Sequence, residues 1–252
     1  HCHTRRQRQM CIRDRLEHGQ ASPPRTMKFV MNSNRKAMKD VSQALFMRTV
    51  WFMTGNSGKV REAQHALQPL GFDVQQLVVE GIEIVEPQCN DLEIVARSKL
   101  KQAKPHLPSI GDALMVEDAG LFVDGLKGFP GAYSSYVLET LGCRGILDLM
   151  EGHEERAAEF QAVAALLLDD RVHVSRGVCR GTIAMEAGGD EGFGFDPIFV
   201  PSPIERNGEN ISTNGLTFAE VSLSVKEQFS HRRNALEGLL ELLSTIDSAS
   251  SS

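Results

Sequence analysis

Two adjacent carboxylates, Glu117 and Asp118, follow a short apolar run at Ala113–Val116 and precede a loop with three glycines between Gly125 and Gly131. Successive side chains of a strand point to opposite faces. We therefore expect one carboxylate to turn into a cleft and the other to bond local backbone. Carboxylate oxygens suit Mg²⁺, and backbone N–H groups exposed at glycines suit phosphate. The segment predicts a metal and phosphate site; a strand that ends in a polar turn is the alternative.

A second candidate phosphate site lies upstream. The apolar run Thr49–Met53 predicts a buried strand, a turn with Thr54 and Asn56 follows, and apolar residues at helical spacing predict a helix over 57–70. The N-terminus of such a helix presents free N–H groups to an anion, and Lys59 in its first turn could reach a phosphate. Neither the P-loop motif nor the glycine fingerprint of dinucleotide-binding proteins occurs in this segment. An ordinary turn capped by Asn56 is the alternative.

Aromatic residues mark a third segment, Gly192–Pro201, where Phe193 and Phe195 stand beside Asp196. Rings so closely spaced can stack on a nucleotide base. They can equally belong to the core, which is the commoner use of phenylalanine.

Basic residues gather at the start of the last predicted helix, over 230–246. Lys226 precedes this helix, Ser230 is a candidate N-cap, and His231 and Arg232 occupy its first turn. Cations are unfavourable at a helix N-terminus, so this placement indicates an anionic or carbonyl-bearing ligand. A solvated helix end is the alternative.

Taken in this order, the segments resemble the inosine triphosphate pyrophosphatase family, which hydrolyses non-standard purine nucleoside triphosphates. The resemblance runs from about Met47 to about Ile246. Its motifs are Thr54-x-Asn56-x-x-Lys59, Val116-Glu117-Asp118-x-Gly120, Gly128-x-Pro130-Gly131, Phe193-Gly194-Phe195-Asp196-Pro197, Thr217-Phe218-Ala219-Glu220, and Lys226 with Ser230-His231-Arg232.

The resemblance implies a role for each matching residue. The triphosphate would be held by Thr54, Asn56, Lys59 and Lys99. Mg²⁺ would be bound by Glu86 and Asp118, and the catalytic residues would be Asp118, which orients the attacking water, and Lys59. The base would stack on Phe195 with Phe193 behind it, and would be surrounded by Asp196, Lys226, His231 and Arg232.

One position departs from the family pattern. Ser or Thr usually follows the carboxylate pair, whereas this chain has Ala119. If that hydroxyl bonds the phosphate or its water, one contact is missing, and we expect a reduced rate rather than a different reaction.

The predicted elements alternate between strands and helices, which indicates an α/β fold with a mixed, twisted sheet. Strands are expected over 49–54, 73–79, 113–117, 121–124, 159–168, 172–184 and 198–200, and helices over 57–70, 91–104, 132–141, 144–151 and 230–246. Asn90 is expected to cap the second helix, with Glu93 in a capping box, and residues 201–215 to form a polar loop.

For the fold, the resemblance implies an elongated mixed sheet flanked by helices, in two lobes with the active site in the cleft between them. It also implies a homodimer. The reaction would convert ITP, dITP or XTP to the monophosphate and pyrophosphate, and would remove deaminated purines from the nucleotide pool.

Charge divides the 252 residues into unlike parts. Residues 1–46 carry ten Lys and Arg against three Asp and Glu, while the whole chain has a net charge of −6. We expect residues 1–46 to be a disordered or non-native extension, with Met47 or Met27 as a natural start. Residues 47–246 are expected to form one two-lobed catalytic domain, and residues 247–252 a frayed tail. An acidic body argues against non-specific nucleic-acid binding.

The five cysteines form no CxxC pair, and no apolar run is long enough to span a membrane. Together with the lack of a signal-peptide pattern, this predicts reduced thiols in a cytoplasmic protein without membrane or nucleic-acid partners, and no zinc site.

Two other functions fit parts of the pattern. A regulatory module could sense a phosphate ligand without turnover, although it would not need paired metal carboxylates. A pyrophosphatase for pyrimidine or methylated nucleotides is the second alternative, because a stacking phenylalanine accepts any base.

Deleting residues 1–46 should leave the melting temperature and activity essentially unchanged, because this segment offers no core-forming pattern and the first buried strand begins after Met47. Thermal melts and activity assays of the full and truncated chains test the expectation. A large loss of stability on truncation would contradict it.

Overall fold

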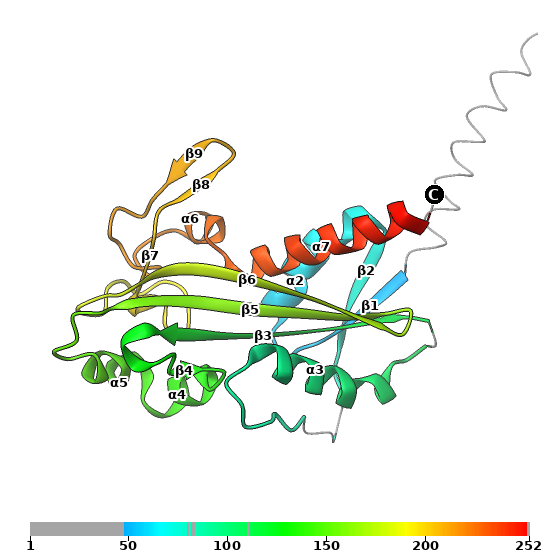
Figure 1. The fold of residues 1–252 in the computed structure, drawn as a ribbon, viewed down its shortest axis with the longest axis horizontal. Coiled ribbons are helices and arrows are strands. Elements are labelled where there is room, and N and C mark those ends of the chain that lie inside the picture. The colour runs from blue at the N-terminus through cyan, green and yellow to red at the C-terminus, as the bar shows by residue number, and fades with distance from the viewer. Residues whose placement is uncertain (1–47, 80, 82–83, 110, 251–252) are drawn as a thin grey trace, which may run out of the picture. The chain divides into compact units, whose positions relative to one another are not determined.

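The computed structural model describes residues 48–79, 81, 84–109 and 111–250 (Figure 1). For Leu70 and residues 244–250 it describes the backbone alone. The segment 1–46, the proposed start at Met47 and the last two residues of the chain lie outside the described residues, so the expectations for them stay predictions.

A mixed seven-stranded sheet forms the centre of the fold. Its strands are β1 (Arg48–Met53), β2 (Phe72–Leu77), β3 (Ala113–Val123), β4 (Pro130–Gly131), β5 (Ala157–Leu168), β6 (Arg171–Ile183) and β7 (Phe199–Pro201). Their order is β2-β1-β3-β5-β6-β7, with β4 paired to β3. β1 runs parallel to β2 and β3, whereas the β3–β5, β5–β6 and β6–β7 pairs are antiparallel. The predicted α/β class, mixed sheet and β5–β6 hairpin are confirmed.

Helices cover both faces of this sheet. The α-helices are α2 (Ser57–Leu67), α3 (Leu92–Ala103), α4 (Ser134–Thr140), α5 (Gly142–Leu149), α6 (Leu223–Gln228) and α7 (His231–Ser250). Short 3₁₀ turns occur at Gln68–Leu70, Lys104–His106, Asp124–Leu126 and Asp196–Ile198. Figure 1 shows α2 and α7 on one side of the sheet and α3, α4 and α5 on the other.

Several elements differ from the expectations drawn from sequence. β3 is one strand where two were expected, since it continues through Gly120 without a break. A Cβ atom at Gly120 would lie 2.2 Å from the carbonyl oxygen of Gly131 on β4, so glycine is needed there for the two strands to approach. The expected loop over 201–215 contains a hairpin of β8 (Ile204–Arg206) and β9 (Glu209–Ile211). Helix α6 was not foreseen; with six residues it is too short to show a helical period.

The cap of α3 was also assigned to the wrong residue. Asp91 is the N-cap, and its side chain accepts a hydrogen bond from the Glu93 N–H at 2.8 Å. Asn90 instead accepts one from the Ala132 N–H at 3.2 Å, which ties the start of α3 to the loop before α4. Both residues are good caps, so a contact between segments far apart in sequence decided between them.

The buried apolar residues form separate clusters along β3. Met115 packs with α2 and α7 on one face of the sheet, whereas Val116 packs with α3 on the other. Further along the strand, Leu121 and Val123 join a third cluster, which also contains residues of α5 and β7. The segment between these clusters holds the Glu117–Asp118 pair, so the carboxylates lie where the apolar core is interrupted.

Helix α7 crosses β6 at very close range, at Gly177. A Cβ atom there would lie 2.0 Å from the His231 carbonyl oxygen and 2.3 Å from the Ala235 nitrogen. Only glycine allows this approach, so Gly177 sets the position of the first turn of α7, which carries Arg232.

Gly177→Ala should destabilise the protein by about 1–3 kcal/mol, the usual cost of overpacking, because the α7 backbone must move away from β6. At about 2–4 °C per kcal/mol for a domain of this size, the melting temperature should fall by several degrees. Gly55→Ala is the matched control, since its added methyl meets no atom within 4 Å. Equal melting temperatures for the two variants would contradict this role of Gly177.

Candidate active site

A cavity of about 470 Å³ opens at the carboxyl ends of β1 and β2, beside the middle of β3. It brings together five residues predicted for the phosphate end of the site: Thr54, Lys59, Glu86, Lys99 and Asp118. Glu117, Ala119 and Ser135 also line it. The residues predicted to surround the base lie outside this lining. Ligands of open α/β sheets commonly bind at the carboxyl ends of strands.

The turn before α2 holds the phosphate-end residues in place. The Asn56 side chain accepts hydrogen bonds from the Gly58 and Lys59 N–H groups at 2.8 and 3.3 Å, and is therefore the N-cap of α2. The Thr54 hydroxyl oxygen accepts one from the Asn56 N–H at 3.1 Å. The cap orients the first turn of α2, so that Lys59 reaches toward β3.

The two adjacent carboxylates of β3 face opposite sides of the sheet, as strand geometry predicts. Glu117 turns toward α2 and α7, where Oε2 lies 2.5 Å from Lys59 Nζ and Oε1 lies 3.4 Å from Arg232 Nε. Its side chain is 1% exposed. Glu117 thus pairs with cations from two helices rather than with local backbone, which corrects the expectation for the second carboxylate.

Those cations control the ionisation of Glu117. Burial alone would raise the pKa of this carboxyl, but Lys59 and Arg232 outweigh it and lower the pKa to about 2. The group is therefore ionised at neutral pH.

Asp118 turns to the other face, toward α3. Lys99 Nζ lies 2.9 Å from Asp118 Oδ1 and 2.6 Å from Glu86 Oε1, so one ammonium bridges both predicted metal ligands. Burial raises the pKa of Asp118 although Lys99 opposes this, while the two carboxylates raise the pKa of Lys99 against its burial. The arrangement gathers two acidic groups and one cation in a partly closed site.

Asp118 has an oxygen to spare for a cation. Oδ2 is buried, and no described residue bonds it. Glu86 is half exposed, so its carboxylate is accessible from the cavity. This donor set of carboxylate oxygens fits Mg²⁺, although no group of three or more His, Cys, Asp and Glu side chains within the described ranges is arranged to hold a metal by itself.

The two phenylalanines of the aromatic segment occupy opposite environments. Phe195 is 3% exposed and packs in the cluster with Phe199 and Phe218, whereas Phe193 is 63% exposed. Lys226 Nζ lies 4.1 Å from the centroid of the Phe193 ring and forms an ion pair with Asp196. The free ring is thus Phe193, the reverse of the expected order.

His231 lies against Phe160, with ring centroids 5.1 Å apart and the planes inclined by 14°. Burial and the neighbouring Arg232 lower the pKa of His231 to about 3, so the imidazole is neutral at physiological pH. Its Nδ1 is buried without a hydrogen-bond partner among the described residues. A neutral imidazole has one donor and one acceptor nitrogen to offer a ligand.

One acidic residue of this region was missed in the sequence: Glu62 on α2, whose carboxylate lies 3.4 Å from Arg232 Nη1. Glu117 was predicted as one of the two carboxylates, but its ion-pair partners were not. The alternation of side chains along β3 predicts that Glu117 faces away from Asp118. The sequence does not predict the partners of Glu117, because they come from α2 and α7, at opposite ends of the described chain. No sequence signal marks Glu62, which reads as one exposed position of an amphipathic helix.

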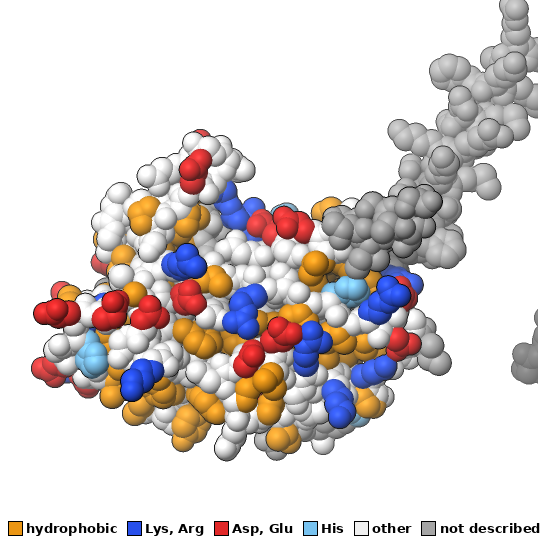
Figure 2. All heavy atoms as spheres, viewed as in Figure 1, with side chains coloured by type: hydrophobic (Ala, Val, Ile, Leu, Met, Phe, Trp, Pro, Cys, Tyr) orange, Lys and Arg blue, Asp and Glu red, His pale blue; other side chains and the backbone are white. Residues whose placement is uncertain are grey.

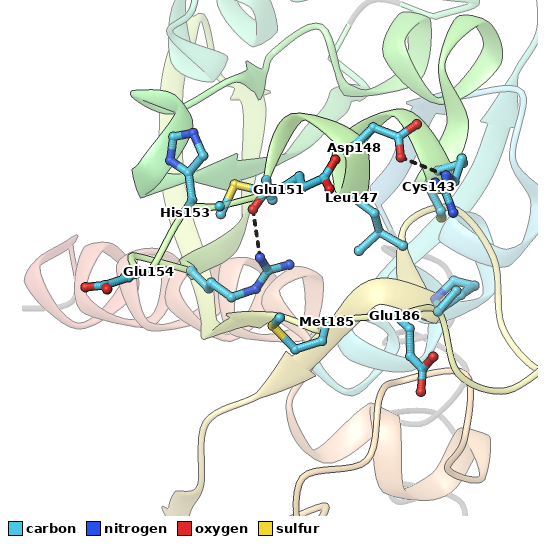
Figure 3. Close-up of a pocket in the computed structure, with 14 residues that line it drawn as sticks. Cys143, Leu147, Asp148, Glu151, His153, Glu154, Met185 and Glu186 are labelled. Carbon is cyan, nitrogen blue, oxygen red and sulfur yellow. Dashed lines mark hydrogen bonds and ion pairs between the residues drawn. The ribbon is translucent and has the colours of Figure 1, made fainter.

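A larger cavity, of about 830 Å³, lies beside α5 and the end of β6 (Figure 3). Several acidic side chains line it, including Glu151, Glu154 and Glu186, and Figure 2 shows Asp and Glu gathered over this end of the fold. The Arg156 guanidinium donates hydrogen bonds to the backbone carbonyls of Met150, Ile183 and Ala184. An acidic rim repels a triphosphate, so the smaller cavity is the candidate site.

Within the described ranges, no helix combines the length and the apolar character needed to cross a lipid bilayer.

The low pKa of Glu117 predicts a loss of stability in acid. Relative to the ordinary value of 4.5, the native state holds the charged form more strongly, so this stabilisation is present above pH 4.5 and is lost as the pH falls toward 2. The difference is on the order of 3 kcal/mol. Urea unfolding between pH 6 and pH 3 should show a shallower decline for Glu117→Gln than for the wild type and the control Glu159→Gln. Parallel curves for all three proteins would contradict the assignment.

Comparison with known proteins places this chain in a family. The model of the Ham1 family matches residues 50–242. The dITP/XTP pyrophosphatase of Ignicoccus hospitalis is 43% identical over 198 residues, which cover 78% of this chain and 97% of that protein. The dITP/XTP pyrophosphatase of Pyrococcus horikoshii is 41% identical over 194 residues, or 77% of this chain and 96% of that protein.

Solved structures agree with the sequence relatives. The Staphylococcus aureus Ham1 protein superposes with a TM-score of 0.66 at 25% identity, covering 79% of this chain and 99% of that one. A HAM1 protein from Coxiella burnetii has the same TM-score at 26% identity and covers 79% of this chain and all of that one. A match over most of the described sequence, with a shared mixed sheet, shows that the chain belongs to the Ham1 family.

Proposed function

We propose that this protein hydrolyses ITP, dITP and XTP to the nucleoside monophosphate and pyrophosphate. The observation that carries the proposal is the cavity at the carboxyl ends of β1 and β2, beside the middle of β3, which gathers Lys59 and Lys99 with Glu86 and Asp118. Two ammonium groups and two carboxylates suit a metal-bound triphosphate. Relatives about 40% identical named dITP/XTP pyrophosphatases support the choice of substrate.

The phosphate end of the substrate would lie among Thr54, Asn56, Lys59 and Lys99. The N-terminus of α2, capped by Asn56, adds a favourable dipole for an anion. Glu86 and Asp118 would hold Mg²⁺, whose chemistry is to neutralise charge on phosphate oxygens. Asp118 would also orient the water that attacks the phosphorus. The lysines would stabilise charge that develops on the phosphate oxygens.

The base would stack on Phe193, since its ring is exposed whereas that of Phe195 is in the core. Lys226 and Asp196 flank this ring. The neutral His231 and the charged Arg232 can donate to the 6-oxo group of hypoxanthine or xanthine. Adenine carries a 6-amino donor instead, which leaves polar groups unpaired, at a cost of about 1–3 kcal/mol per group.

We further propose that the enzyme is cytoplasmic, homodimeric and dependent on Mg²⁺, that it acts without nucleic-acid or membrane partners, and that it removes deaminated purines from the nucleotide pool. At position 119, in the wall of the cavity, this chain has Ala where the family usually has Ser or Thr, so the hydroxyl is absent. Ala119→Ser should therefore raise the rate of triphosphate hydrolysis.

The direct test is pyrophosphate release from a panel of triphosphates, with and without Mg²⁺. The expected result is fast, Mg²⁺-dependent release from dITP, ITP and XTP, and slow release from ATP, GTP and pyrimidine triphosphates. Binding without release would indicate the phosphate sensor, and preference for a pyrimidine or methylated nucleotide would indicate the other pyrophosphatase.

Asp118→Asn should abolish turnover while leaving the fold intact, because the change keeps the shape of the side chain and removes the charge proposed to hold Mg²⁺. Glu86→Gln should have a similar but milder effect, since that carboxyl is half exposed. Asp148→Asn, in a remote surface ion pair with Arg144, is the control. Near-normal turnover of Asp118→Asn, with unchanged metal dependence, would rule out its role as a metal ligand.

Arg232→Ala should lower kcat/KM for dITP and XTP much more than kcat/KM for ATP. Loss of one charge-assisted hydrogen bond to the base costs about 1.5–3 kcal/mol, or roughly ten- to a hundredfold in kcat/KM. Arg233→Ala removes a neighbouring arginine that pairs with Glu237 and should change nothing. An equal fall for all three substrates would assign Arg232 to the phosphates or the fold instead of the base.

A further inference from the structure

Glu117 is a buried charged group to which neither the resemblance nor the proposed reaction gives a task. It is surrounded by two cations, and each of these belongs to a different end of the proposed site: Lys59 to the phosphates and Arg232 to the base. The two cations come from the first turns of α2 and α7, far apart in the sequence.

The direction of the Glu117 side chain separates it from the metal-binding face. On β3 its register partner is Ala164 of β5, and both face the cluster between the sheet and α2 and α7. Asp118, paired with Val163, faces α3 on the opposite side, where Lys99 and Glu86 lie. Although both carboxylates line the cavity, Glu117 pairs with Lys59 and Arg232, whereas Asp118 pairs with Lys99.

Without Glu117, Lys59 would lose the carboxylate that lies 2.5 Å from its Nζ, and Arg232 would be left with Glu62, which lies 3.4 Å from its Nη1 and is partly exposed. A buried charge is tolerated only with a partner, and removal of the partner leaves the remaining charge to move or repel its neighbours. The pairing thus holds a phosphate-binding group and a base-reading group at a set separation.

We propose that Glu117 is a positioning residue that couples the two ends of the nucleotide site: it holds Lys59 for the triphosphate and Arg232 for the base, so that a substrate must match both at once. The inference rests on the proposed function. Its consequence is that Glu117 controls substrate affinity and the choice of base, and through Lys59 also the chemical step.

The test compares Glu117→Gln, which keeps the shape and removes the charge, with Glu117→Asp, which keeps the charge on a shorter side chain. For Glu117→Gln, the KM for dITP should rise about ten- to a hundredfold, and the ratio of kcat/KM between dITP and dATP should fall toward that of Arg232→Ala. kcat should also fall, because Lys59 would stabilise charge on the phosphate oxygens, but the loss of base preference distinguishes this variant from a purely catalytic defect. Glu117→Asp should recover part of both losses, and it carries the test if Glu117→Gln does not fold.

A double-mutant cycle with Lys59→Met separates coupling from independent effects. Lys59→Met should raise KM by a smaller factor in the Glu117→Gln background than in the wild type, because Lys59 has already lost its set position. Glu159→Gln, on the neighbouring strand, is the matched control and should leave all kinetic constants unchanged.

Three results would overturn the inference while the proposed function stands: unchanged KM and base preference with only a lower melting temperature; a collapse of kcat with KM and base preference unchanged; or additive effects in the cycle. A wild-type protein that releases pyrophosphate from no triphosphate would instead overturn the proposed function, and this inference with it.

Discussion

A carboxylate buried in the centre of the sheet has to be neutralised by nearby cations, and this requirement organises the site. Glu117 is almost fully enclosed, and its charge persists only because Lys59 and Arg232 converge on it. Those cations in turn require α2 and α7 to begin at the same place beside β3. The close approach at Gly177 and the Asn56 cap serve that geometry: one brings α7 against the sheet, and the other orients the start of α2.

The same strand explains why the two halves of the site stay distinct. β3 runs from one apolar cluster to another, and its polar residues lie between them. Because neighbouring side chains alternate, one carboxylate serves the helices on one face and the other serves α3 on the opposite face. Asp118 keeps one buried oxygen that no described residue bonds, while Glu117 forms ion pairs with Lys59 and Arg232.

At the end of the site proposed to bind the base, burial separates residues that look equivalent. Phe195 completes the core, and Phe193 remains open with Lys226 over its ring. His231 is kept neutral by burial and by Arg232, which makes it a donor and acceptor rather than a cation. A site with one charged and one neutral group can distinguish an oxo from an amino substituent, since a mismatched buried polar group is costly.

The sequence by itself determined the α/β class, the β5–β6 hairpin, the turn before α2 and the family, because these depend on local periodicity and on motifs in a set order. Only the tertiary structure decided that Asp91 caps α3, that Phe193 is the exposed ring, and that Glu117 joins Lys59 to Arg232. Each of these depends on which distant segment packs against an otherwise equivalent residue. Burial and long-range pairing set that choice, and neither has a period that can be read along the chain.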